Sequence, residues 1–205
     1  MLKIYIARHG QNEDNANGIL NGHRDLPLTE LGREQARQLA DGIQEAGYAF
    51  DAVYASPLSR AYDTAQIVCD TLGMADPIIL DSAIERDFGV MTGELVSDIE
   101  RLCTPDILKT DPIIYFLTPA GGETFPMVLE RAGEALEQLK ADHPEGSVLL
   151  VTHGDFGKMM YAAFYDIPWM DMLTKFHFGN CELLLLSEDV HPDESHVLKI
   201  EQHNH

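Results

Sequence analysis

Two short apolar runs, each followed by a histidine and a glycine, dominate the hydrophobic pattern of the chain. Residues 2–7 form the first run, which leads into Arg8 and His9, and residues 147–152 form the second, which leads into His153. Continuous apolar runs of this length are typical of buried strands in an α/β sheet. The ligand crevice of such a sheet lies beyond the carboxyl ends of its strands, so we expect these three side chains at one rim.

Elsewhere, apolar residues with helical spacing alternate with further short strand-like segments. Helices are predicted at residues 29–47, 57–72, 124–140 and 154–165, and strands at 2–7, 51–56, 77–80, 147–152, 182–187 and 197–201. Thr29 is an expected helix cap, and Pro57 is expected at a first helical position. This alternation predicts an α/β fold, a three-layer α/β/α sandwich with a mostly parallel central sheet. The length of 205 residues fits one such domain, spanning residues 1–205.

Two segments show neither the helical spacing of apolar residues nor a strand-like apolar run. Residues 11–28 are rich in Asn, Gly and Asp and predict a long loop, either a functional one or a plain surface excursion. Residues 94–122 predict a short helix near 96–102 and then a segment interrupted by Pro105, Pro112 and Pro119. We interpret residues 94–122 as an insertion that covers the sheet edge or the site as a partial lid.

The charge of the chain narrows the range of partners. With 34 acidic and 14 basic residues the formal net charge is -20, which argues against a large interface with nucleic acid or with an anionic membrane. It also makes each arginine informative, because an anionic substrate needs a local concentration of positive charge. Arg8 and Arg60 both lie just beyond predicted strands, although Arg60 alone is equally compatible with a solvated surface position.

The remaining composition predicts a cytoplasmic protein. No run approaches the roughly 18 apolar residues of a membrane span, and the first ten residues indicate neither a signal peptide nor an anchor. Cys69, Cys103 and Cys181 are odd in number and lack metal-type spacing, so we expect reduced thiols. The closing residues 202–205 are too few and too mixed to predict a metal-binding tract.

A set of short motifs follows in a fixed order along the chain. They are Arg8-His9-Gly10 with Asn15, Gly22, Asp25, Pro27–Gly32, Gln35-Ala36, Ser56–Ala61, Thr64-Ala65, Glu85–Gly89, Gly122-Glu123 and His153-Gly154. Each motif alone is weak, but the ordered set is highly specific. On these motifs the chain resembles the histidine phosphatase superfamily, in its phosphoglycerate mutase-like branch, over nearly its whole length.

The resemblance implies a phosphomonoesterase that passes the phosphoryl group of a small phosphorylated metabolite to a histidine and then to water. His9 is the implied nucleophile, and Glu85 the implied general acid and base. The residues implied to bind the phosphoryl group are Arg8, Asn15, Arg60 and His153, with Gly22 and Gly154 as possible further substrate contacts. A histidine and arginine cage of this kind implies neither a metal nor a cofactor.

Two positions near the motifs depart from the family pattern. Asn12 stands where the family has a threonine-like residue, and Asp155 follows the second His-Gly pair. A carboxylate turned inward would oppose the binding of an anion, so we expect Asp155 to point away from the site.

Two further departures bear on the choice of reaction. Phe88 stands where true mutases have a tyrosine, and Lys109 is the only basic residue between Leu102 and Glu130. A phosphatase is therefore favoured over a cofactor-dependent phosphoglycerate mutase, which needs extra cations to retain its intermediate. A non-catalytic phosphate-binding module is the third alternative.

Overall fold

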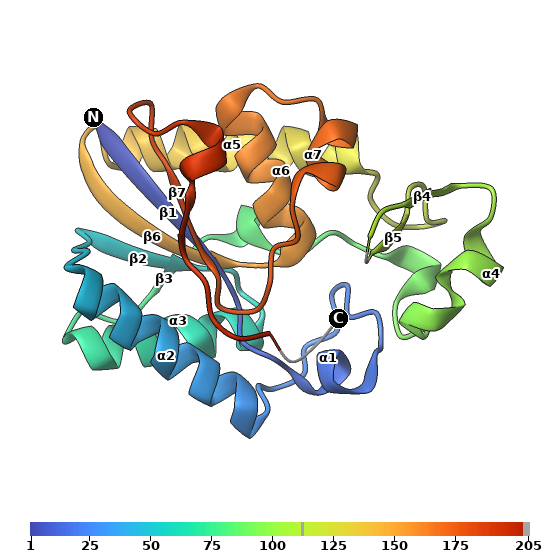
Figure 1. The fold of residues 1–205 in the computed structure, drawn as a ribbon, viewed down its shortest axis with the longest axis horizontal. Coiled ribbons are helices and arrows are strands. Elements are labelled where there is room, and N and C mark those ends of the chain that lie inside the picture. The colour runs from blue at the N-terminus through green and yellow to red at the C-terminus, as the bar shows by residue number, and fades with distance from the viewer. Residues whose placement is uncertain (112, 203–205) are drawn as a thin grey trace.

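The computed structural model describes residues 1–111 and 113–202, and its centre is a six-stranded mixed sheet with helices on both faces (Figure 1). The strands lie in the order β3 (Ile78–Ile79), β2 (Ala52–Ala55), β6 (Gly146–Thr152), β1 (Leu2–Arg8), β7 (Leu183–Leu186) and β8 (His196–Leu198). Of these strands only β7 runs against the others. The predicted α/β/α sandwich with a mostly parallel sheet is confirmed. Pro112 and the last three residues lie outside the described part of the chain.

The two strands predicted from the apolar runs are direct neighbours. β1 pairs in parallel with β6, with Leu2 opposite Gly146 and Arg8 opposite Thr152. Successive side chains alternate between the faces of the sheet, so Ile4 and Ile6 enter one apolar cluster and Tyr5 enters the other. Both faces of these strands are therefore buried, which explains their unbroken apolar sequence.

Helices cover both faces of the sheet. On one face lie α2 (Glu30–Ala46) and α3 (Ser59–Leu72), and on the other lie α5 (Phe125–Asp142), α6 (Gly154–Tyr165) and α7 (Trp169–Lys175). Thr29 caps α2, and its side chain accepts a hydrogen bond from the backbone of Gly32, as expected. The prediction for Pro57 was wrong, because α3 begins two residues later and Leu58 takes the cap position.

The sequence did not predict short elements that the structure contains in residues 11–28 and 94–122. Residues 11–28 contain α1 (Glu13–Asn17), whose five residues are too few to show an apolar stripe. In the insertion, the predicted short helix is confirmed as a 3-10 turn at Val96–Asp98 followed by α4 (Ile99–Cys103). The next residues form an unpredicted hairpin of β4 (Ile107–Lys109) and β5 (Ile114–Phe116).

The insertion lies beyond the carboxyl ends of the parallel strands (Figure 1), and Tyr115 of β5 joins the main cluster on the face covered by α5, α6 and α7. The insertion also packs on a third apolar cluster, which consists of Leu20, Phe88, Met91, Ile99 and Phe116. The insertion thus has its own apolar support next to the rim that carries His9. Its function as a lid stays a prediction. None of the described helices is long and apolar enough to cross a bilayer.

The segment after β1 is fixed by a very close backbone crossing with the first turn of α2. A Cβ atom on Gly32 would lie 2.0 Å from the carbonyl oxygen of Gln11, and one on Gly10 would lie 2.3 Å from the carbonyl oxygen of Gly32. Only glycine fits at these contacts, since the obstacle is backbone and cannot rotate away. The crossing therefore holds the residues that follow His9 against α2.

We expect Gly32→Ala to lower the free energy of unfolding by about 1–3 kcal/mol, the usual cost of forcing an extra methyl group into a packed site. The matched control is Gly133→Ala within α5, where nothing lies within 4 Å of the added Cβ. That change removes a flexible residue from a helix and is expected to preserve or raise stability. Urea denaturation of both variants measures the difference, and equal unfolding midpoints would contradict the proposed crossing.

Candidate functional site

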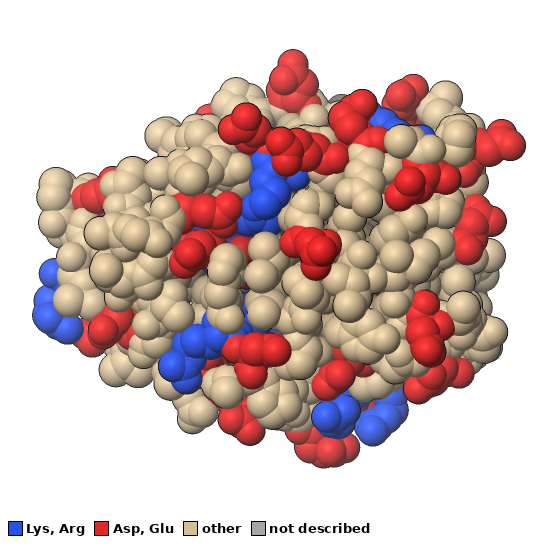
Figure 2. Space-filling view, turned by 180° about the vertical axis from the view of Figure 1, so that it is seen from behind, with Lys and Arg blue, Asp and Glu red and all other residues tan. Residues whose placement is uncertain are grey.

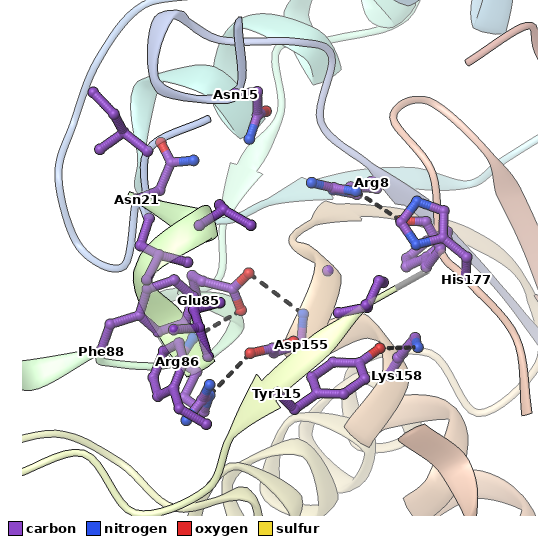
Figure 3. Close-up of a pocket in the computed structure, with 18 of the residues that line it drawn as sticks. Arg8, Asn15, Asn21, Glu85, Arg86, Phe88, Tyr115, Asp155, Lys158 and His177 are labelled. Carbon is purple, nitrogen blue, oxygen red and sulfur yellow. Dashed lines mark hydrogen bonds and ion pairs between the residues drawn. The ribbon is translucent and has the colours of Figure 1, made fainter. Parts of the chain in front are cut away.

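A cavity of about 200 Å³ opens between the carboxyl ends of β1 and β6 and the insertion. Six of the eight candidate residues line it, namely Arg8, His9, Asn15, Arg60, Glu85 and Gly154. The other two, Gly22 and His153, are not part of its lining, but Gly22 contacts Arg60 and His153 lies against the ring of His9. The residues expected at one rim are thus brought together, and Figure 3 shows Arg8, Asn15 and Glu85 among them.

The register of β1 and β6 places the two histidines side by side. Arg8 and Thr152 are paired, so His9 and His153 are the next residues of adjacent strands, and their ring centroids lie 5.1 Å apart. The Nδ1 atom of His9 lies 2.7 Å from the carbonyl oxygen of Gly10. A carbonyl oxygen only accepts, so Nδ1 carries the proton and Nε2 keeps its lone pair.

The imidazole of His9 is held in the neutral form. Its side chain is buried, and burial together with the cations of Arg60 and Arg8 holds the pKa of His9 well below its usual value. The Nε atom of Arg60 donates to Nε2 of His9 at 3.2 Å, which a protonated ring could not accept. At neutral pH His9 therefore presents an unprotonated ring nitrogen.

Arg60 is a fully buried cation whose hydrogen-bond partners are uncharged. Its Nη1 and Nη2 atoms donate to the backbone carbonyl oxygens of Arg24 at 2.6 Å and of Gly22 at 3.0 Å. Gly22 has φ +50, and a Cβ on it would lie 2.9 Å from Oγ1 of Thr92, so its position favours glycine. Burial lowers the pKa of Arg60 to about 10, which still leaves a cation at neutral pH.

Arg8 and Asn15 present further donors to the cavity. Arg8 Nη1 donates to the carbonyl oxygen of Phe178 at 2.8 Å, while its Nε atom is buried without a hydrogen-bond partner. A Cβ on Gly154 would lie 3.6 Å from that Nε atom, so the glycine keeps this space open. The side-chain oxygen of Asn15 accepts from the backbone of Asn12, and its amide nitrogen faces the cavity (Figure 3). Asn12, the departure from the family pattern, serves as the cap of α1.

His153 has one nitrogen engaged and one without a partner. Its Nε2 atom lies 2.7 Å from Oγ of Ser56, and its Nδ1 atom is buried without a hydrogen bond. Burial and the charge of Arg60 hold the pKa of His153 well below its usual value. The neighbouring ring is therefore neutral as well.

Glu85 is a buried carboxyl group set against the first turn of α6. Its Oε1 atom accepts hydrogen bonds from the backbone nitrogens of Arg86 at 2.8 Å and Phe156 at 3.1 Å. These bonds favour the ionised form, but burial and the neighbouring carboxylate of Asp155 outweigh them and raise the pKa of Glu85. A carboxyl group with a raised pKa can hold a proton closer to neutral pH and give it to a bound ligand.

The expectation that Asp155 points away from the site was wrong. Asp155 lines the cavity, and its Oδ2 atom accepts a hydrogen bond from Nε of Arg86 at 2.9 Å. The guanidinium of Arg86 is almost fully buried, lies over the rings of Phe116 and Phe125, and balances the charge of Asp155. An inward carboxylate is tolerated because its countercharge is built into the wall.

Lys109 does not contribute to the site. It is exposed on the hairpin and pairs with Glu100 at 2.5 Å. The additional lysine of the cavity is Lys158, which the helical stripe of residues 154–165 did not single out. Lys158 lies one helical turn after Gly154 and on the same face of the helix, and this spacing was the signal in the sequence that could have identified it as a cavity residue.

The cavity concentrates positive charge in an acidic molecule. Four of the 14 basic residues line it, Arg8, Arg60, Arg86 and Lys158. Figure 2 shows one face of the molecule, on which acidic side chains are widely spread and basic ones form only small groups. Such a contrast draws a small anion to the cavity and repels large polyanions.

The model of the histidine phosphatase superfamily (branch 1) matches residues 4–201. The chain belongs to this superfamily. A 2,3-bisphosphoglycerate-dependent phosphoglycerate mutase of Parvibaculum lavamentivorans is 34% identical over 160 residues, which cover 74% of each chain. Phosphoserine phosphatase 1 of Hydrogenobacter thermophilus is 29% identical over 182 residues, covering 89% of this chain and 83% of that protein.

Solved structures agree with this assignment. A mycobacterial glucosyl-3-phosphoglycerate phosphatase, solved in complex with VO3, superposes with a TM-score of 0.77 and 27% identity, covering 90% of this chain and 92% of that one. Members of the superfamily related to this chain thus include both phosphatases and phosphoglycerate mutases.

We expect the ring of His9 to remain neutral, with its proton on Nδ1, at about pH 6.5, where an ordinary histidine is half protonated. Nitrogen NMR of the 15N-labelled protein reads the protonation of each ring atom, and loss of the signals in His9→Asn assigns them. The unfolded chain in urea serves as the control, because its histidines lose the burial and the arginine charges. An imidazolium at His9 under these conditions would contradict the described electrostatics.

Proposed function

We propose that this member of the superfamily hydrolyses phosphomonoesters of small molecules through a phosphohistidine on His9. The observation that carries the proposal is the unprotonated Nε2 atom of His9, buried beside cations that have no carboxylate bound to their guanidinium groups among the described residues. A phosphoryl group bound there supplies the missing negative charge. Positioning and electrostatic stabilisation are the main requirements of phosphoryl transfer.

In the first step, His9 Nε2 attacks phosphorus and the bond from phosphorus to the ester oxygen breaks. Glu85, protonated because of its raised pKa, gives its proton to the leaving oxygen. The ring of His9 gains positive charge as the new bond forms, and the carbonyl oxygen of Gly10 at Nδ1 stabilises it. The products of this step are a free alcohol and phosphohistidine.

In the second step, water attacks the phosphohistidine and the bond from phosphorus to Nε2 breaks. Glu85, now ionised, takes the proton of the attacking water, and inorganic phosphate leaves. In both steps Arg8, Arg60 and the amide of Asn15 bind the non-bridging oxygens. If the hydroxyl of Ser56 donates to Nε2 of His153, the proton of that ring lies on Nδ1 and serves as a further donor.

A phosphoglycerate mutase is the second candidate, favoured by the mutase relative and by the two extra cations of the cavity. Of these, Arg86 is already balanced by Asp155, so only Lys158 adds free positive charge. Among the described residues of the insertion no cation lines the cavity, because Arg101 pairs with Asp98 and Lys109 with Glu100 outside it. This supports release of the alcohol and reaction with water over retention of a multiply charged intermediate.

We expect His9→Asn to abolish turnover of phosphomonoesters, because the covalent intermediate cannot form. Acid-labile, base-stable label from a 32P-substrate should be trapped on the wild-type protein and not on the variant. The assays contain a chelator, and we expect activity to persist, because the arginines rather than a metal ion supply the positive charge. Label on a serine, or interconversion of 3- and 2-phosphoglycerate primed by bisphosphoglycerate faster than release of phosphate from any monoester, would overturn the proposal.

We expect Glu85→Gln to slow phosphorylation of the protein by an alkyl phosphate by about 100- to 10,000-fold, the usual contribution of a general acid. The effect on p-nitrophenyl phosphate should be far smaller, because nitrophenolate leaves without a proton. In the wild type, the alkyl phosphate rate should fall as pH rises through the raised pKa of Glu85, and this limb should vanish in the variant. Single-turnover quench experiments measure the phosphorylation rate with each ester and its dependence on pH. The exposed variant Glu130→Gln is the control. Equal losses of rate on the two esters would contradict the role of Glu85 as the general acid.

A further inference from the structure

A second polar corner lies in the cavity, formed by Lys158 of α6 and Tyr115 of β5. Lys158 is 3% exposed, and its Nζ atom donates to Oη of Tyr115 at 2.6 Å and more weakly to the carbonyl oxygen of Leu173 at 3.4 Å. Both side chains line the same cavity as His9, and Figure 3 shows the hydrogen bond between them. No step of the proposed hydrolysis uses them.

The corner offers mainly donors to a ligand. A lysine ammonium has three donors and no acceptor, and the oxygen of Tyr115 already accepts one of them. Burial raises the pKa of Tyr115, so the phenol keeps a hydrogen that it can donate. The complementary ligand group is therefore an acceptor.

The charge of the corner is not balanced by an ion pair. In the described part of the chain no carboxylate forms a salt bridge with Lys158, and the nearby Asp155 has its Oδ2 atom on Arg86. Burial lowers the pKa of Lys158 to about 8, with Asp155 opposing and Arg8 adding to this shift, so the side chain is still mainly charged at neutral pH. A buried cation without a counterion is unfavourable, and an anionic acceptor removes that cost.

The corner is close to the residues proposed to bind the phosphoryl group. Gly154, which faces Nε of Arg8, and Lys158 are four residues apart on α6, so their backbones are separated by about 6 Å along the helix axis, at 1.5 Å per residue. Residues with this spacing share one face of a helix. One small ligand can therefore reach both places.

We propose that Lys158 and Tyr115 bind a carboxylate of the substrate, so that the preferred substrates are short phosphomonoesters that carry a carboxylate a few bonds from the ester oxygen. This rests on the proposed hydrolysis and names the substrate class of the same site. A carboxylate fits better than a second phosphate, because a single lysine balances one negative charge. The cavity volume of about 200 Å³ also favours a small molecule.

The test compares matched pairs of esters that differ in the carboxylate. The pairs are phosphoglycolate with ethyl phosphate, 3-phosphonooxypropanoate with propyl phosphate, and 4-phosphonooxybutanoate with butyl phosphate. We expect wild-type kcat/KM to be at least about tenfold higher for the carboxylated ester of one pair, because the corner binds it by charge-assisted hydrogen bonds. In Lys158→Met the ratio should fall to about one, and in Tyr115→Phe it should fall by a smaller factor.

The control is Lys109→Met, which removes an exposed lysine outside the cavity and should keep the wild-type ratio. A wild-type ratio of about one or below in every pair, or a ratio that survives in both Lys158→Met and Tyr115→Phe, overturns the carboxylate site while hydrolysis stands. Should Lys158→Met fail to fold, the wild-type ratio and Tyr115→Phe decide. Absence of phosphate release from all six esters and from p-nitrophenyl phosphate instead overturns the proposed hydrolysis.

Discussion

The site depends on buried arginine charge that the protein leaves uncompensated. Arg60 is held by two backbone carbonyls and by His9, and Arg8 by the carbonyl of Phe178. Carbonyl oxygens fix the guanidinium groups without cancelling their charge. Burial together with that charge keeps His9 and His153 neutral, and the charge favours binding of an anion in a protein whose net charge is -20. Had carboxylates held the same arginines, the geometry could persist but the attraction for a phosphoryl group would be lost.

The two carboxyl groups of the cavity have opposite surroundings. Asp155 faces a cation directly, whereas Glu85 is bound by backbone nitrogens and has Asp155 as a neighbour. Pairs of titratable groups whose environments differ in this way identify the acid and the fixed charge of a site. Asp155, unfavourable for binding when considered alone, thus adds to the rise that burial causes in the pKa of Glu85, while Arg86 cancels much of its charge toward the ligand.

The sequence predicted the elements that have a clear period and the motifs attached to their ends. Thr29 and Gly47 bound α2 as expected, and the parallel pairing of β1 with β6 explains why two distant His-Gly motifs meet. The eight candidate positions lie in or against one cavity because each is at the end of a parallel strand or in the segment that follows one. Their catalytic roles remain proposals.

What could not be predicted was decided by contacts between distant residues. The hairpin of β4 and β5 has strands of three residues, too short for an alternating pattern. The direction of Asp155 is set by Arg86, 69 residues away, and the surroundings of Lys158 are set by Tyr115, 43 residues away. In the sequence Lys158 is a polar position on an apolar helix, and its contacts with Tyr115, Leu173 and Phe176 make it a buried cation.

One helix joins the chemistry of the site to its selection of ligands. The first turn of α6 supplies Gly154, the charge of Asp155 and the backbone nitrogen of Phe156 that binds Glu85, and the next turn supplies Lys158. The position of α6 therefore affects both the pKa of Glu85 and the distance from Lys158 to the residues proposed to bind the phosphoryl group. The insertion instead contributes Tyr115 and apolar side chains such as Ile114 and Phe116. Changes in those apolar side chains can reshape the cavity wall, whereas a shift of α6 would alter the proposed catalysis and the proposed carboxylate site together.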